Sequence, residues 1–89
     1  MGKVSSFAIE GVDCWFYSQD HRPPPFHARR RGQWHVRVFF LKPKSGMIEP
    51  VTNHLDRMTR ADRNNLCEMA AARREELLGE WEEKVHHDE

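Results

Sequence analysis

The chain has 89 residues, of which 38% are hydrophobic and 31% charged, and its net charge is zero when histidine is neutral. These values predict one folded domain over residues 1–89 and exclude a membrane span, while the nine aromatic residues exclude a disordered chain. Residues 1–44 carry eight Lys or Arg against three Asp or Glu, and residues 45–89 carry six against eleven, so a basic half (+5) precedes an acidic half (−5).

The first residues lack the apolar stretch of a signal peptide, and the two cysteines, Cys14 and Cys67, lie far apart in the sequence. We therefore expect free thiols rather than a disulfide, a cytoplasmic location and no contact with a membrane.

Two strands are predicted near the start of the chain, over residues 3–9 and 12–18. Both segments are rich in β-branched and aromatic residues, and Glu10-Gly11 between them suits a tight turn. Residues 20–25 follow with three consecutive prolines, which fix φ and remove backbone donors. A stiff, extended connector is expected there.

The next two strands are predicted over residues 26–30 and 33–41, and the loop between them decides which side chains share a face. A two-residue turn at Arg31-Gly32 would place His27 among the apolar residues. A three-residue loop, Arg30-Arg31-Gly32, separates the two kinds of side chain better and is the register predicted here. One face then holds Phe26, Ala28, Trp34, Val36, Val38 and Phe40, and the other holds His27, Arg29, His35 and Arg37, with Phe39 as the apolar exception. In this register His27 lies directly opposite His35.

The C-terminal part predicts a short edge strand at residues 47–51 and then one long helix, from Thr59 to about Val85. Thr59-x-x-Asp62 has the form of a capping box, and no proline follows it. A mainly apolar stripe at helical spacing would face the sheet, formed by Leu66, Met69, Ala70, Arg73, Leu77, Trp81 and Val85 (or Lys84), with Leu78 beside it. The expected fold class is α+β, a small antiparallel sheet of four or five strands packed on one long C-terminal helix.

Two motifs carry a resemblance to a known family: the Pro23-Pro24-x-Phe26-His27-Ala28 segment, followed by Gly32, and the helical pattern Arg74-Glu75-Glu76-Leu77-Leu78-x-x-Trp81. In both, the chain resembles a bacterial family known as domain of unknown function 4160. The resemblance spans most of the chain and implies a strand–strand–hairpin–helix order without an established activity. It also implies membership in toxin–antitoxin-like gene pairs, as is suggested for the family. The chain departs from the family pattern at Pro25, where the family has a histidine.

The polar face of the predicted hairpin favours a binding module. Guanidinium groups suit phosphate, and an exposed aromatic ring suits a stacked base, so RNA or DNA is the expected partner. The residues assigned to nucleic acid are Arg29, Arg30, Arg31, Arg37 and Phe39. A partner protein, such as a toxin–antitoxin-like mate or a second copy of the chain, is the other binding hypothesis.

Two further hypotheses stay open. A ribonuclease-like enzyme would use His27 and His35 as general base and acid, with arginine stabilising the charge on phosphorus. A purely structural protein would act through the acidic helix, and the His/Arg face would then be an ordinary solvated sheet face. No cofactor and no metal are expected, because the six histidines match no zinc-site spacing.

Overall fold

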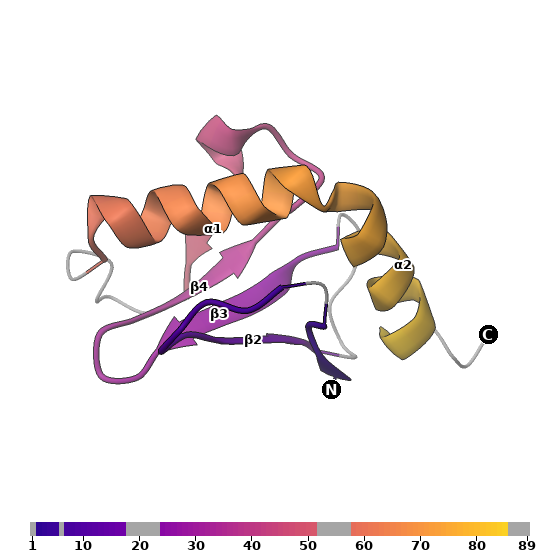
Figure 1. The fold of residues 1–89 in the computed structure, drawn as a ribbon, viewed down its shortest axis with the longest axis horizontal. Helices are drawn as coiled ribbons and strands as arrows, with labels where there is room; N and C mark the ends of the chain where they lie inside the picture. The colour runs from indigo at the N-terminus through magenta and orange to yellow at the C-terminus, as the bar shows by residue number, and fades with distance from the viewer. Residues whose placement is uncertain (1, 6, 18–23, 52–57, 86–89) are drawn as a thin grey trace.

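The computed structural model describes residues 2–5, 7–17, 24–51 and 58–85 of the chain. Figure 1 shows a twisted sheet with both α-helices on one of its sides. In chain order the elements are β1 (Gly2–Lys3), β2 (Asp13–Phe16), β3 (Phe26–Arg30), β4 (Trp34–Val38), the 3-10 helix η1 (Lys44–Gly46), β5 (Ile48–Pro50), α1 (Arg60–Ala72) and α2 (Arg74–Val85).

The strands form one antiparallel meander in the order β1-β2-β3-β4-β5. The order follows the chain, because each strand pairs with the next one: three residues connect β3 to β4, and nine residues connect each of the other neighbouring pairs. The α+β class predicted from the sequence is therefore confirmed. No helix within the described ranges is long and apolar enough to cross a membrane.

The core lies between the sheet and the helices. Alternate residues of β2, β3 and β4 point toward α1 and α2, as the period of two in a strand requires. The fully buried members include Phe16, Phe26, Ala28, Val36, Val38, Phe40, Met47, Leu66, Ala70 and Leu77, with Trp34 and Trp81 almost as deep. The apolar face predicted for the hairpin is thus the core face, and Leu66, Ala70, Leu77 and Trp81 of the predicted helical stripe pack against it.

The hairpin register differs from the prediction by two residues. The loop is Arg31-Gly32-Gln33 rather than Arg30-Arg31-Gly32, so that His27 pairs with Arg37 and Arg29 pairs with His35. Gly32 has φ +75°, and the Gln33 N–H donates to the Arg30 carbonyl at 2.9 Å. A shift of two residues keeps every side chain on its predicted face, so the hydrophobic pattern alone does not distinguish the two registers.

The predicted strand over residues 3–9 is wrong for most of its length. Only Gly2–Lys3 forms a strand, and the chain then leaves β2 before Ile9 meets Val12 in an isolated bridge. Gly11 at φ +80° supplies the predicted turn, because a left-handed conformation is easiest for glycine. The second predicted strand ends at Phe16, and residues 18–23, with most of the predicted connector, lie outside the described residues.

The single long helix is also wrong, because the helix is interrupted at Arg73. This residue has φ −125° and ψ 32°, and its N–H donates to the Ala70 carbonyl at 3.3 Å. The start of α2 is fixed by the Arg74 guanidinium, which donates to the carbonyls of Phe40 and Lys42, both at 2.9 Å. Figure 1 shows α2 continuing at an angle to α1, toward the N-terminal side of the sheet. Contacts outside the helix therefore override a segment rich in helix formers.

Candidate functional site

The side of the sheet opposite the helices carries a cluster of aromatic, histidine and arginine side chains. They come from alternate positions of β2, β3, β4 and β5 and from Tyr17 directly after β2, which places them on one face by strand geometry. We call this the open face, and it comprises Asp13, Trp15, Tyr17, His27, Arg29, His35, Arg37 and Glu49. None of the described helices covers it (Figure 1).

The two histidines on the open face are in contact, as the sequence led us to expect, but along a diagonal. His27 Nδ1 lies 3.1 Å from His35 Nε2, and one nitrogen must donate a proton to the other. The His27 ring lies among aromatic rings, with Trp15 stacked at 5.5 Å and Tyr17 edge-on at 4.3 Å between centroids. His27 is only 2% exposed, so it is not the solvated residue that a wet sheet face would carry.

Electrostatics keep His35 neutral near pH 7. Partial burial lowers its pKa first, and the nearby His27, Arg29 and Arg37 lower it further because each disfavours a second positive charge. A neutral His35 has one ring nitrogen without a proton, so it can either accept the hydrogen bond from His27 or donate one to it, depending on the tautomer.

The arginines of the open face are held by carboxylates. Arg29 lies 3.3 Å from Asp13 and its guanidinium carbon is 5.2 Å from the centre of the Trp15 ring. Arg37 lies 2.9 Å from Glu49. Arg31 in the hairpin loop has 82% of its side chain exposed and lies 3.7 Å from Asp13. Both carboxylates are themselves more than half exposed, so these are surface ion pairs of low strength.

Arg30 is not part of the open face, although the sequence grouped it with Arg29 and Arg31. As the last residue of β3 it points to the helix side, where its Nε and Nη2 donate to Asp62 at 3.0 and 2.9 Å. Trp34 Nε1 donates to the same carboxylate at 3.3 Å. The structure thus gives Arg30 a structural contact between β3 and the first turn of α1.

Phe39, the residue assigned to base stacking, directly follows β4. Its ring is partly buried, and the Lys42 ammonium lies 4.5 Å from its centre. Phe39 therefore borders the open face at the end of β4, away from the hairpin loop.

Trp15 and Tyr17, which the sequence analysis did not assign to the site, also lie on the open face and are partly exposed. Strand alternation indicates this placement: Cys14 and Phe16 face the core, so Trp15 and Tyr17, one residue further along, face the other side of the sheet. Asp13 and Glu49, the acidic partners of the arginines, were not identified from the sequence.

Metal binding finds no support in the described ranges, where no three His, Cys, Asp or Glu side chains gather closely enough to hold an ion.

The two cysteines are free and buried. Burial raises the pKa of Cys14 to about 12, with the Asp13 charge adding to the effect, and burial also raises the pKa of Cys67. Neither thiol has the lowered pKa of a nucleophile.

Comparison with known proteins gives a family without an assigned activity. A family model described as "Domain of unknown function (DUF4160)" matches residues 11–82, a range that contains β2 to β5, α1 and most of α2. No curated protein and no solved structure matches the chain. Because the match covers most of the chain and agrees with the resemblance seen in the sequence, the chain belongs to the family of domains of unknown function DUF4160.

Proposed function

We propose that the open face binds single-stranded nucleic acid, with RNA as the first candidate. The observation that carries the proposal is the pairing of two partly exposed aromatic rings, Trp15 and Tyr17, with two arginines on one uncovered sheet face and a third, Arg31, in the adjacent hairpin loop. Single strands are bound without strict sequence preference by this combination, because every base has a face that stacks and every nucleotide has a phosphate.

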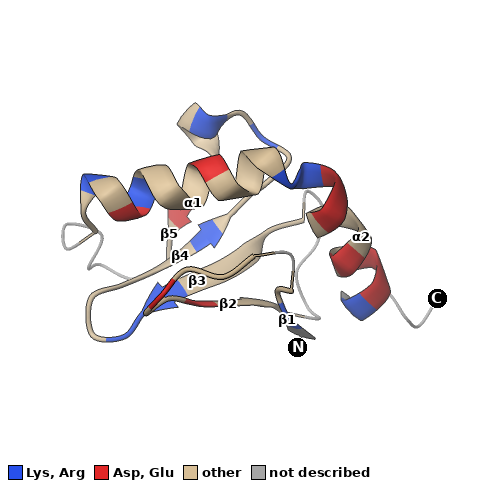
Figure 2. Cartoon of the chain, in the orientation of Figure 1, with Lys and Arg blue, Asp and Glu red and all other residues tan. Residues whose placement is uncertain are grey.

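The ion pairs on the open face are compatible with phosphate binding. Arg29 and Arg37 share their charge with carboxylates that are 54% and 55% exposed. Such exposed pairs contribute about 0–1 kcal/mol each, so a phosphate can replace a carboxylate at little cost. Arg31 at the hairpin loop is the most exposed of the three and is the natural first contact. Figure 2 places basic residues at this loop, while acidic residues gather on α2.

The ribonuclease hypothesis has weaker support from the same geometry. A base and an acid that act on one phosphodiester must reach its two sides, whereas His27 and His35 touch each other at 3.1 Å. His27 is also nearly inaccessible to a substrate. Binding without cleavage accounts better for this pair.

Two further expectations from the sequence remain proposals. The protein would lie in the cytoplasm, and its acidic helix α2 would bind a partner protein, as in a toxin–antitoxin-like pair. The feature behind it is the exposed acidic surface of α2, formed by Glu75, Glu76, Glu82 and Glu83. It would leave the open face free for nucleic acid.

The test is a titration of a fluorescent single-stranded RNA decamer at several salt concentrations. Each phosphate contact adds about 0.7 to the slope of log affinity against log salt for a single strand. We expect Arg31→Gln and Arg37→Gln each to lower the slope by about this amount. The matched control is Arg63→Gln, because Arg63 is an exposed arginine of α1 on the helix side of the sheet.

Equal effects of Arg31→Gln and Arg63→Gln would mean that net charge and not the open face attracts the RNA. No binding even at low salt would exclude the proposal altogether. Backbone amide shifts on β2, β3 and β4 report the location directly, and a folded spectrum for each variant excludes unfolding as the cause.

A further inference from the structure

Two histidines and two arginines form a rectangle across β3 and β4, at the centre of the open face. Arg29 lies directly opposite His35, and His27 lies directly opposite Arg37. The histidines therefore occupy one diagonal, along which their rings are in hydrogen-bonding contact, and the arginines occupy the other two corners. Opposite residues have Cβ atoms about 4.5–5.5 Å apart, so both guanidinium groups can reach a ligand that sits on His35.

The two histidines lie at different depths. His27 is 2% exposed and contacts the rings of Trp15 and Tyr17, whereas His35 is partly exposed. His35 is therefore the member of the pair that a ligand can touch, and His27 is the member that holds the His35 ring in place.

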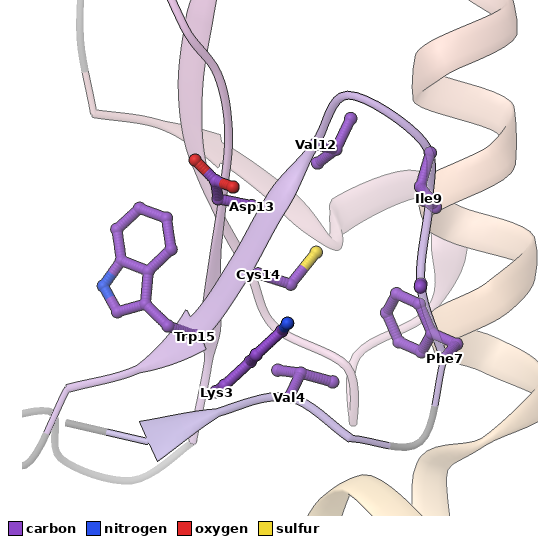
Figure 3. A pocket seen from close by; sticks show the side chains of 9 residues that line it. Lys3, Val4, Phe7, Ile9, Val12, Asp13, Cys14 and Trp15 are labelled. Carbon is purple, nitrogen blue, oxygen red and sulfur yellow. The ribbon is translucent and has the colours of Figure 1, made fainter.

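Arg29 has a hydrogen-bond donor that is not used within the described residues. Its Nη2 lies 3.3 Å from Asp13 Oδ2, but its Nε is buried and has no acceptor there. Figure 3 shows the side chains of Asp13 and Trp15 on one side of β2 and that of Cys14 on the other, so this guanidinium group lies beside the carboxylate and over the indole ring. A buried donor without an acceptor is unfavourable, and an oxygen of a bound anion would satisfy it.

The contact between the histidines limits how many protons the pair can hold. A neutral imidazole carries one N–H, so one ring donates and the other accepts. One additional proton leaves this bond intact, because a doubly protonated ring can still donate to a neutral one. A second additional proton would set two N–H groups against each other across 3.1 Å. The pair therefore takes up at most one proton while the contact lasts.

The charges around His35 decide whether that proton binds. Partial burial lowers the pKa of His35, and His27, Arg29 and Arg37 lower it further, so the pair is neutral near pH 7 in the unbound protein. An anion between the two arginines would offset their charge and attract a positive charge on His35, and both effects raise its pKa. The charged and titratable groups that the described residues place on this side of the sheet are Lys3 of β1, Asp13 of β2, Tyr17 directly after it, His27 and Arg29 of β3, His35 and Arg37 of β4 and Glu49 of β5.

We propose that Arg29, His35 and Arg37 form a subsite for one phosphate of the bound strand, and that the histidine pair takes up one proton from solvent as this phosphate binds. The inference rests on the proposed function and gives the histidines a part in it. The guanidinium groups would exchange their exposed carboxylate partners for phosphate oxygens. A doubly protonated His35 would donate from Nε2 to His27 Nδ1 and from its own Nδ1 to the phosphate. Nucleic acid would therefore bind more tightly as the pH falls.

The test is the RNA decamer titration repeated between pH 8 and pH 6 at constant salt. We expect the affinity to increase several-fold as the pH falls, by no more than about tenfold per pH unit, which is the limit for one proton. Calorimetry in two buffers with different ionisation enthalpies counts the proton directly. His35→Gln should abolish the pH dependence and keep the salt slope measured at pH 8, because glutamine can bond to His27 but does not titrate. Arg31→Gln is the matched control, since it should lower the salt slope and keep the pH dependence.

The NMR signal of the His35 Hε1 proton gives a second measurement on the unaltered chain. The pKa that it reports should be higher with the RNA decamer, or with dimethyl phosphate, than with chloride at the same ionic strength. Dimethyl phosphate suits this purpose because it is a diester like the RNA backbone and keeps one negative charge throughout this pH range. The rise should be smaller in Arg37→Gln and unchanged in Arg63→Gln.

The inference is overturned if RNA binds equally well at pH 8 and pH 6, if His35→Gln keeps the pH dependence, or if Arg37→Gln and Arg63→Gln behave alike. RNA binding by the open face would stand in each of these cases. If dimethyl phosphate raises the pKa of His35 but RNA does not bind, the phosphate subsite stands and the RNA proposal fails. If neither probe binds, both fail.

Discussion

The contact between Arg30 and Asp62 leads to a prediction about stability rather than binding. Asp62 accepts two hydrogen bonds from the Arg30 guanidinium and one from Trp34 Nε1, and its own N–H donates to Thr59 Oγ1 at 3.0 Å. One carboxylate therefore joins the end of β3, the start of β4 and the first turn of α1. The side chains of Arg30 and Asp62 are 27% and 14% exposed, between a surface pair and a buried one.

The loss of stability expected when Asp62 is removed follows from this intermediate burial. An exposed pair contributes about 0–1 kcal/mol, and breaking a buried pair costs about 3–5 kcal/mol, so Asp62→Ala should lower the free energy of unfolding by about 2 kcal/mol. With a denaturant slope of about 1–2 kcal/mol per M, the urea midpoint falls by about 1–2 M. Asp13→Ala is the matched control, because Asp13 also contacts arginine but is 54% exposed. Its removal should change stability by less than about 0.5 kcal/mol.

The assay is equilibrium urea unfolding followed by tryptophan fluorescence. A double-mutant cycle with Arg30→Met should give a coupling of about 1 kcal/mol or more, since the two side chains interact directly. Arg30→Met should also leave the salt slope of RNA binding unchanged, in contrast to Arg31→Gln. The reasoning is refuted if Asp62→Ala and Asp13→Ala lose equally little stability, or if Arg30→Met lowers the salt slope as Arg31→Gln does.

Two further predictions concern pH and glycine. Because the pKa of His35 is lowered in the folded state, the unfolded chain binds more protons at this site, and stability falls as the pH decreases from about 6.5 through the lower folded pKa. Thermal unfolding between pH 8 and pH 5 should show a smaller loss for His35→Gln, and equal losses would contradict this origin. Gly79→Ala should raise the free energy of unfolding by up to about 1 kcal/mol, because Gly79 is an exposed helical residue with open space around its Cα. Gly32→Ala should lower it by about 1 kcal/mol, because φ is +75° there, and urea unfolding of both variants should show opposite signs.

The face of each hairpin residue could be predicted from the sequence, and the register could not. Apolar side chains alternate from Phe26 to Ala28 and from Trp34 to Phe40, which determines their shared face. A shift of two residues leaves that alternation intact, so the choice between loops 30–32 and 31–33 depends on turn geometry. The incorrect loop also moved Arg30 from the strand to the hairpin tip. This single displacement is why Arg30 was grouped with the nucleic-acid-binding residues.

The break between α1 and α2 left no signal in the sequence, because residues 72–75 are Ala, Arg, Arg and Glu, all compatible with a helix. The cause lies 34 residues away in the chain, at the Phe40 carbonyl that Arg74 binds. Only one half of the predicted capping box forms, again because of a contact with a distant part of the chain. Thr59 does cap the Asp62 N–H, but the Asp62 carboxylate bonds with Arg30 and Trp34 across the core.

Two ion pairs neutralise part of the charge difference between the basic and the acidic half of the chain. Arg30 pairs with Asp62 and Lys44 pairs with Glu68, each joining the basic half to the acidic one. The cations that remain exposed near the hairpin loop and the carboxylates on α2 lie at opposite ends of the long axis (Figure 2). A separation of charge on this scale orients an approaching polyanion before contact. If the open face binds nucleic acid as proposed, the strand should reach it from the hairpin loop, with Arg31 as the first contact, because the acidic surface of α2 lies at the other end of the molecule.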